Sequence, residues 1–177
     1  MRLFIAAELP ENLLEALAET SARLRDTVKG RYVAPDSFHL TLAFLGEVEA
    51  NRIDDAARAI DDACQEFEAF EVALGPLGSF GKRSSATLWQ GLSEQGALSE
   101  LATSVRNELS TRDFTFDEKA FKAHVTLMRK ADLAHGELPM PVTGHGTIEY
   151  VTLFRSDLSG ARPVYEPLHS VELCNNQ

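Results

Sequence analysis

The sequence predicts an α+β fold in which antiparallel sheets are combined with helices. Segments with helical and with strand periodicity are mixed along the chain, and few consecutive units have the pattern of a parallel strand–helix–strand crossover. A short motif also recurs at close to half the chain length, which indicates two related lobes. With 177 residues, of which 44% are hydrophobic, the chain has the size and composition expected of one compact domain, residues 1–177.

The first half of the chain is expected to begin with a short strand, Arg2–Ala7, followed by a helix. Pro10 suits the first turn of that helix, and leucines at helical spacing continue it to Val28, before Lys29-Gly30. The segments expected after it are a loop at Arg31–Ser37, a strand at Phe38–Leu45 ended by Gly46, and a helix marked by Ile53, Ala56, Ala57, Ile60, Cys64 and Phe67.

The second half is expected to contain more strands than helices. Gly75–Ser85, with three glycines, a proline and three serines, is interpreted as a loop, and Ser93 as the residue that caps the third helix. The other expected segments are strands at Phe70–Leu74, Ala86–Gly91, Phe121–Met128, Thr147–Phe154 and Pro163–Leu173, a helix marked by Leu98, Leu101, Val105 and Leu109, and a polar connection at Ala131–Gly144.

Composition limits the kinds of partner and location. With a net charge of −10, the chain lacks the extended basic surface of a protein that binds along a duplex. A nucleic acid would therefore be held locally, at an end or a small site. No apolar run approaches the roughly 20 residues that span a bilayer, and the apolar segment after Arg2 is too short for a signal peptide. We therefore expect a cytoplasmic protein without a membrane partner. Two distant cysteines, Cys64 and Cys174, indicate neither a disulfide framework nor a zinc motif.

The recurring motif is His-x-Thr-hydrophobic. It occurs as Phe38-His39-Leu40-Thr41-Leu42 and as Ala123-His124-Val125-Thr126-Leu127, with the histidines 85 positions apart (124 − 39). Because side chains alternate along a strand, each copy places its histidine and threonine on one face and its apolar residues, Phe44 among them in the first copy, on the other. If the two lobes pack with the polar faces opposed, two imidazoles and two hydroxyls line one cleft.

This set of side chains suits chemistry on a phosphate ester. In-line displacement requires a base for the nucleophile and an acid for the leaving oxygen, and histidine titrates near neutral pH without much tuning. Threonine hydroxyls can donate to the non-bridging oxygens as negative charge develops. A single His-x-Thr in a strand is more often structural than functional. Two copies with the same alternation, at half-length, favour a shared site at His39, Thr41, His124 and Thr126.

At these residues the chain resembles the 2H phosphoesterase superfamily, and within it the RNA 2′,3′-cyclic phosphodiesterases, historically called 2′-5′ RNA ligases. The resemblance covers nearly the full length. One departure is Lys122-Ala123 before the second histidine, where many relatives carry a proline. The segments that carry the resemblance are Arg2–Ala6 with Leu9-Pro10, Phe38–Val48, Leu88–Gly91, His124–Arg129 and Tyr165–Leu168.

The resemblance implies a bilobal, pseudo-two-fold fold in which two antiparallel sheets line a central cleft and the helices lie outside. It also implies hydrolysis of an RNA 2′,3′-cyclic phosphate to a 2′-phosphate, and some relatives run the reverse reaction on tRNA halves. His39 would be the general acid for the 3′ oxygen and His124 the general base on water. Thr41 and Thr126 would hold the phosphate oxygens. We expect a monomer that needs no cofactor, no metal and no protein partner.

Arg129 is the trailing arginine of the second motif, and the resemblance places it in the cleft as a phosphate ligand. Simple alternation from His124 instead puts Arg129 on the apolar face of its strand. Further basic residues are expected to form at most a modest rim around the cleft: Arg31, Lys82, Arg83, Lys122 and Lys130. The histidines outside the motif, His135, His145 and His169, are expected to be structural or exposed.

Three alternatives remain open at this point. The substrate of the same chemistry could be a small cyclic nucleotide, ADP-ribose cyclic phosphate or a 2′-5′ linked oligonucleotide. A module that only binds RNA ends is disfavoured by the intact histidines and threonines in both motifs. A zinc site would need a third ligand with suitable spacing, and none is evident in the sequence.

Overall fold

The computed structural model describes residues 1–93 and 96–175. Its strands are β1 (Arg2–Ala7), β2 (Lys29–Tyr32), β3 (Leu40–Glu47), β4 (Phe70–Phe80), β5 (Ala86–Ser93), β6 (His124–Asp132), β7 (His145–Ile148), β8 (Tyr150–Asp157) and β9 (Val164–Glu172). Its helices are α1 (Glu11–Leu24), α2 (Ile53–Cys64) and α3 (Ala97–Thr111), with short 3₁₀ turns η1 (Pro35–Ser37), η2 (Ala50–Arg52) and η3 (Arg83–Ser85).

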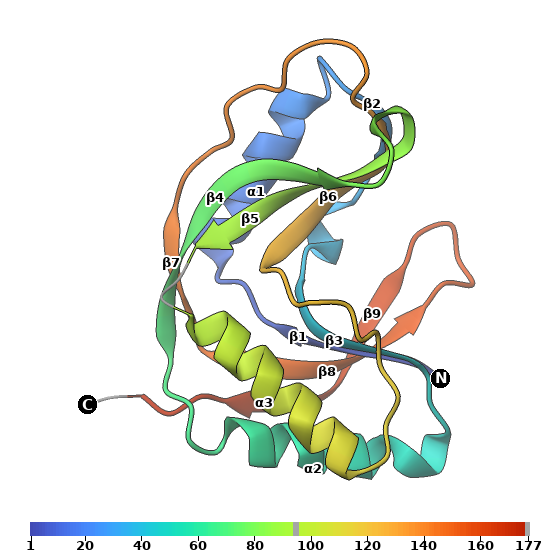
Figure 1. Ribbon diagram of the computed structural model, residues 1–177, viewed down its shortest axis with the longest axis vertical. Helices are drawn as coiled ribbons and strands as arrows, with labels where there is room; N and C mark the ends of the chain where they lie inside the picture. The colour runs from blue at the N-terminus through green and yellow to red at the C-terminus, as the bar shows by residue number, and fades with distance from the viewer. Residues whose placement is uncertain (94–95, 176–177) are drawn as a thin grey trace.

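The strands form two sheets, and all the pairings between named strands are antiparallel. Sheet A has the order β3-β1-β8-β9, and sheet B has the order β2-β6-β5-β4-β7. The helices lie outside the pair of sheets: α2 and α3 pack together beneath sheet A, while α1 lies behind sheet B (Figure 1). The α+β architecture with two antiparallel sheets, expected from the sequence, is confirmed.

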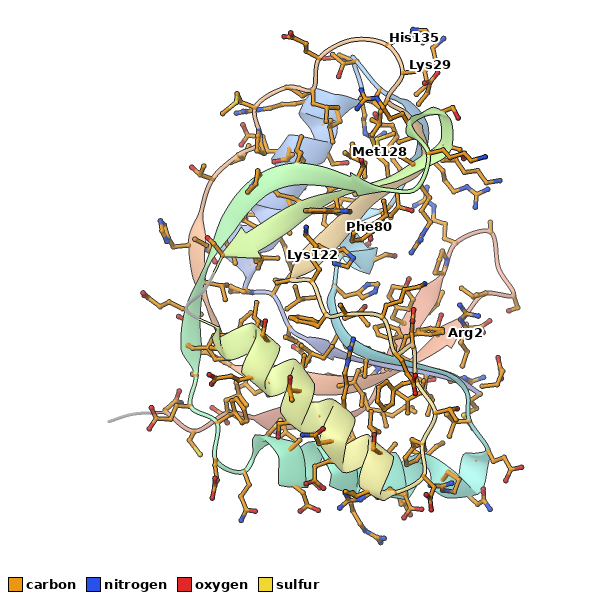
Figure 2. The ribbon with its side chains drawn as sticks, in the orientation of Figure 1. Arg2, Lys29, Phe80, Lys122, Met128 and His135 are labelled. Atoms are coloured by element: carbon orange, nitrogen blue, oxygen red, sulfur yellow. The ribbon has the colours of Figure 1, made fainter. Side chains whose placement is uncertain are left out.

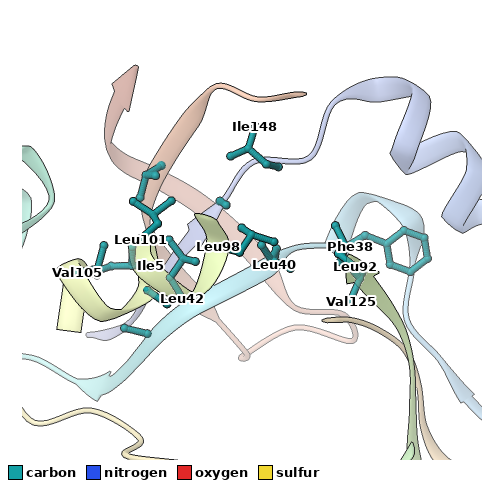
Figure 3. Close-up of a cluster of buried hydrophobic side chains, with 14 of the residues drawn as sticks. Ile5, Phe38, Leu40, Leu42, Leu92, Leu98, Leu101, Val105, Val125 and Ile148 are labelled. Carbon is teal, nitrogen blue, oxygen red and sulfur yellow. The ribbon is translucent and has the colours of Figure 1, made fainter. Parts of the chain in front are cut away.

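The hydrophobic residues of both sheets and all three helices join one buried cluster. Ile5, Leu40 and Leu42 of sheet A are fully buried, and they pack near Leu98 and Leu101 of α3 (Figure 3). Val125 of sheet B belongs to the same cluster. Because this cluster joins both sheets and the helices into one core, the two sheets have fixed positions relative to each other. None of the helices in the described part of the chain is long and apolar enough to cross a membrane.

The expected loop at Arg31–Ser37 is partly wrong, since Lys29–Tyr32 forms the edge strand β2. Helix α1 ends at Leu24, and Val28, which prolonged its apolar periodicity, is buried in a turn whose amide donates to the Leu24 carbonyl. A Cβ atom on Gly30 would lie 2.8 Å from the Lys130 carbonyl oxygen. This close approach of two backbones explains a glycine inside a strand that pairs with β6.

The expected loop at Gly75–Ser85 is also partly wrong, because β4 continues to Phe80. The pairing of β4 with β5 shifts by one residue between Leu74 and Leu77, so a β-bulge accommodates Pro76, which has no amide hydrogen to donate. Only the segment from Gly81 to Ser85 is a turn, and Gly81 adopts a left-handed φ of 83° there. The composition of this segment predicts a loop, but pairing with β5 makes the part up to Phe80 a strand.

Two further boundaries differ from expectation. Ser93 does not cap α3; it ends β5, and α3 begins at Ala97 after Gly96, whose φ is 92°. The single strand expected at Thr147–Phe154 is divided at Glu149 into β7 and β8, which belong to different sheets. A continuous alternating pattern cannot show where a chain passes from one sheet to another.

Candidate active site between the two sheets

The two motif histidines lie on facing sheets. His39 immediately precedes β3 of sheet A, and His124 is the first residue of β6 in sheet B. These two strands contact each other across the molecule. His124 is also close enough to His39 for its charge to lower the pKa of His39, and the charge of Arg129 lowers the pKa of both imidazoles. The structure therefore brings together the three ionisable residues that the sequence assigned to one site.

Both imidazoles have the same local hydrogen bond. Nδ1 of His39 donates to the carbonyl of Ser37 at 2.7 Å, and Nδ1 of His124 donates to the carbonyl of Lys122 at 2.6 Å. A carbonyl oxygen can only accept, so the hydrogen must be on Nδ1 in each ring. This bond orients the imidazole and leaves Nε2 as the nitrogen that can accept or release a proton.

Two aromatic rings pack against each histidine. His39 lies 4.7 Å from Phe4 and 5.1 Å from Tyr165, measured between ring centroids. His124 lies 5.1 Å from Phe80 and 5.8 Å from Trp89. Each imidazole is thus held laterally by rings from other strands of its own sheet, which limits rotation about the Nδ1 hydrogen bond. The two halves of the site repeat this arrangement with different residues.

Burial and positive neighbours set the electrostatics of the histidines. Burial is the main cause that lowers the pKa of His39, with the charges of Arg129 and His124 adding to it, and the hydrogen bond to Ser37 opposes the change. Burial likewise lowers the pKa of His124, and the charges of Lys122 and Arg129 act in the same direction. Burial and these positive charges therefore favour the neutral form of both imidazoles.

A β-bulge brings Arg129 to the histidine side of β6. Thr126 lies opposite Trp89, but the next pair along the ladder joins Met128 to Leu88, so β6 contains one extra residue at Leu127. Leu127 and Met128 are consecutive and both fully buried, and alternation resumes with Arg129 on the side of His124. The placement of Arg129 by simple alternation is wrong, and the bulge is the physical reason.

A second bulge acts in the same way in β3. Thr41 lies opposite Ala6 and Ala43 opposite Ile5, which leaves Leu42 as the extra residue. Phe44, expected on the apolar face, therefore lies opposite Phe4 and is only half-buried, with the Arg2 guanidinium 4.7 Å from its ring centroid. Thr41 and Thr126 are both half-buried, on the strands that carry the histidines.

The aromatic neighbours are the part of the site that sequence reasoning missed. Trp89 is only 7% exposed, yet it contacts His124, and the Lys122 ammonium lies 4.6 Å from its ring centroid. Phe80 fell inside the expected loop. Phe80 and Lys122 lie on the side of sheet B that faces sheet A (Figure 2). Tyr165 belonged to a segment that carried the family resemblance, which was the available signal for it.

The remaining histidines lie outside this site. His135 and His145 are exposed, and Nε2 of His169 is 2.7 Å from a carboxylate oxygen of Asp61. Within residues 1–93 and 96–175, no three His, Cys, Asp or Glu side chains are grouped so that they could hold a metal ion.

Comparison with known proteins gives several matches. Residues 8–144 match the model of the 2′-5′ RNA ligase superfamily. An RNA 2′,3′-cyclic phosphodiesterase of Thermus thermophilus is 32% identical over 181 residues, which cover 98% of this chain and 90% of the relative. An enzyme of the same name from Geobacillus stearothermophilus is 32% identical over 129 residues, and the match spans 72% of this chain but 41% of that longer relative.

Solved structures agree with these matches over the whole fold. The crystal structure of TT0787 of Thermus thermophilus superposes with a TM-score of 0.87 at 27% identity, and the alignment covers 100% of both chains. Escherichia coli LigT complexed with 3′-AMP superposes with a TM-score of 0.82 at 29% identity, covering 97% of each chain.

Proposed function

Because the chain belongs to the 2′-5′ RNA ligase superfamily, we propose that it hydrolyses RNA 2′,3′-cyclic phosphate ends to 2′-phosphate ends. The observation that carries this proposal is the pair of imidazoles on facing sheets, each with Nδ1 bound to a carbonyl and Nε2 left for proton transfer. Relatives named RNA 2′,3′-cyclic phosphodiesterase, and a LigT structure that contains a nucleotide with a 3′-phosphate, support the choice of substrate.

In the proposed reaction, Nε2 of His124 takes a proton from water as the water oxygen attacks phosphorus. The bond between phosphorus and the 3′ oxygen breaks, and Nε2–H of His39 donates its proton to that oxygen. The phosphate stays attached to the 2′ oxygen. The proton on His124 and the vacancy on His39 are then restored by exchange with solvent. Each step is an ordinary histidine general acid–base transfer.

The other site residues act on the charge of the phosphate. The hydroxyls of Thr41 and Thr126 donate to the non-bridging oxygens, on which negative charge increases in the transition state. Arg129 supplies a guanidinium for the same oxygens. The bound anion also raises the pKa of both histidines, which offsets the effect of burial and makes a protonated His39 available when substrate is present.

Side chains of this chain provide both proton transfers, so the proposed reaction requires no metal and no cofactor. The test is to incubate the protein in EDTA with a short RNA that ends in a 2′,3′-cyclic phosphate, and to identify the product. A 2′-phosphate is expected. A 3′-phosphate would overturn the assignment of the leaving oxygen, and turnover only after metal is added would overturn the two-histidine mechanism.

Variants separate catalysis from binding. His39→Ala and His124→Ala should each reduce turnover by roughly 100-fold or more, the usual contribution of a positioned acid or base, while affinity for an RNA 2′-phosphate changes little. Retained turnover in either variant would refute the role of that histidine. If the wild-type protein binds RNA ends without turning them over, the chain is a binding module instead.

The physiological setting follows from the same proposal. We propose a cytoplasmic monomer that acts on RNA without a protein partner, with tRNA halves as the candidate RNA. Ligation of such halves would open the same cyclic phosphate with an RNA hydroxyl in place of water: His124 would take the proton of that hydroxyl, and His39 would donate its proton to the 3′ oxygen as the bond from phosphorus breaks. Incubating paired RNA halves with the protein and resolving their length tests this. Wild-type turnover of small cyclic nucleotides but not of RNA ends would redirect the substrate assignment.

A further inference from the structure

The basic residues of this acidic chain differ in whether a carboxylate or carbonyl partner holds them. Most of those on or next to the helices are ion-paired or hydrogen-bonded: Arg23, Arg52, Arg58, Arg112 and Lys119 have carboxylate partners, and Arg106 donates to backbone carbonyls. Within the described residues, no ion pair forms at Arg31, Lys82, Arg129 or Lys130, all of them exposed and all at the β2–β6 edge of sheet B or in the turn after β4. These four residues are called the basic edge below.

Arg31 and Arg129 lie directly opposite each other on β2 and β6, so their side chains share one face of the sheet. Arg129 lowers the pKa of both site histidines, which places this face at the site. Like charges directly opposite each other across a ladder are destabilising, and in the part of the chain that the structure describes no carboxylate forms an ion pair with either residue. An anionic ligand that lies between the two guanidinium groups explains the arrangement. One phosphate bound at the histidines contacts Arg129 and leaves Arg31 for a second anionic group.

An exposed aromatic ring lies beside this edge. Phe80 is 42% exposed although it packs against Trp89 and, edge-on, against His124. The turn after Phe80 carries Lys82 and docks on the end of β6, where the Leu133 amide donates to the carbonyl of Arg83. Cations next to an exposed ring form the combination that holds single-stranded nucleic acid, with bases stacked on the ring and phosphates bound by the cations.

We infer that the basic edge and Phe80 form a binding surface for the single-stranded RNA that precedes the cyclic phosphate. Phe80 stacks a base near the reacting end, and Arg31 binds a backbone phosphate while Arg129 binds the reacting one. This inference rests on the proposed function and extends it, because it makes oligomeric RNA, and not a mononucleotide, the preferred substrate. The negative charge of the rest of the molecule restricts RNA to this surface.

The experiment compares kcat/KM for a 2′,3′-cyclic mononucleotide and for a single-stranded RNA with the same terminal nucleotide, over a range of salt concentrations. The wild-type protein should prefer the oligomer, and the preference should fall as salt rises. In Arg31→Gln the ratio of the two kcat/KM values should fall roughly tenfold, the effect of one hydrogen bond to a charged group. The slope against log salt should decrease by about 0.7, the value for one phosphate contact on a single strand.

Arg58→Gln is the matched control, since it removes the same charge from α2, beneath the other sheet, and should leave the ratio unchanged. For the ring, Phe80→Trp should keep the preference for the oligomer and Phe80→Leu should lose it, whereas a packing role would be served by leucine as well. Equal kcat/KM and equal salt dependence for both substrates, or equal effects of the Arg31 and Arg58 variants, would overturn the inference. Absence of turnover with both substrates would instead overturn the proposed function.

Discussion

Replacing Gly78 with alanine should displace the single tryptophan of the chain. Gly78 of β4 lies opposite Trp89 of β5, and a methyl group on residue 78 would be 2.2 Å from Cη2 and 2.4 Å from Cζ2 of the indole. Carbon atoms do not approach so closely, so the ring must rotate or the strands must separate. Trp89 packs against His124 and beneath the Lys122 ammonium, so the displacement should reach the proposed general base.

The expected size of the effect follows from the packing. Inserting a methyl group into a filled site costs about 1–3 kcal/mol. Since each kcal/mol lowers the Tm of a chain of this length by about 2–4 °C, the Tm should fall by roughly 2–12 °C. A shift of about 1 Å in a catalytic group can cost about 100-fold in rate, and this sets the scale of the loss expected in kcat.

Intrinsic fluorescence is a direct assay, because Trp89 is the only tryptophan. The emission spectrum and the Tm of Gly78→Ala should both differ from the wild type. Gly75→Ala is the matched control in the same strand, because the nearest atom to its added methyl group would be the Gly91 carbonyl oxygen at an ordinary 3.4 Å. If the two variants have the same emission, Tm and kcat, the reasoning from the indole contact is refuted.

Three other predictions concern the site and the thiols. Burial lowers the pKa of both site histidines from the ordinary 6.5, and kcat/KM requires one neutral and one protonated imidazole in the free enzyme, so kcat/KM should be maximal below pH 6.5. The maximum of kcat, which is measured with the phosphate anion bound, should lie at higher pH. A kcat/KM maximum above pH 6.5 would contradict the burial argument. Thr126→Val and Thr41→Val should each lower kcat by roughly 100-fold with little change in Tm, as loss of one donor to the transition state does. An increase in KM with kcat unchanged would instead indicate that the hydroxyl only helps to bind the substrate. Burial raises the pKa of the Cys64 thiol to about 12, so a thiol reagent at neutral pH should modify the exposed Cys174 in the folded protein and Cys64 only after unfolding; rapid modification of both thiols would contradict the buried position of Cys64.

The sequence alone determined the repeated motif, the α+β class and most of the strands that carry the site. Strict alternation around His39 and His124 was enough to place each histidine and threonine on one face, because a period of two is a local property of a strand. Arg129, by contrast, could be assigned to the site only through the family resemblance, because alternation placed it on the opposite face. The helices α2 and α3 could be located because their apolar faces repeat every three or four residues.

Only the tertiary structure decided what depends on pairing between distant strands. The bulges at Leu42 and Leu127 bring Phe44 and Arg129 to the site face, and each exists because the partner strand has one residue fewer at that point. The extension of β4 beyond Gly75, which places Phe80 beside His124, depends on β5 in the same way. Local sequence fixes which side chains alternate, but the register with a neighbouring strand decides where the alternation is reset, and that register exists only in the folded chain.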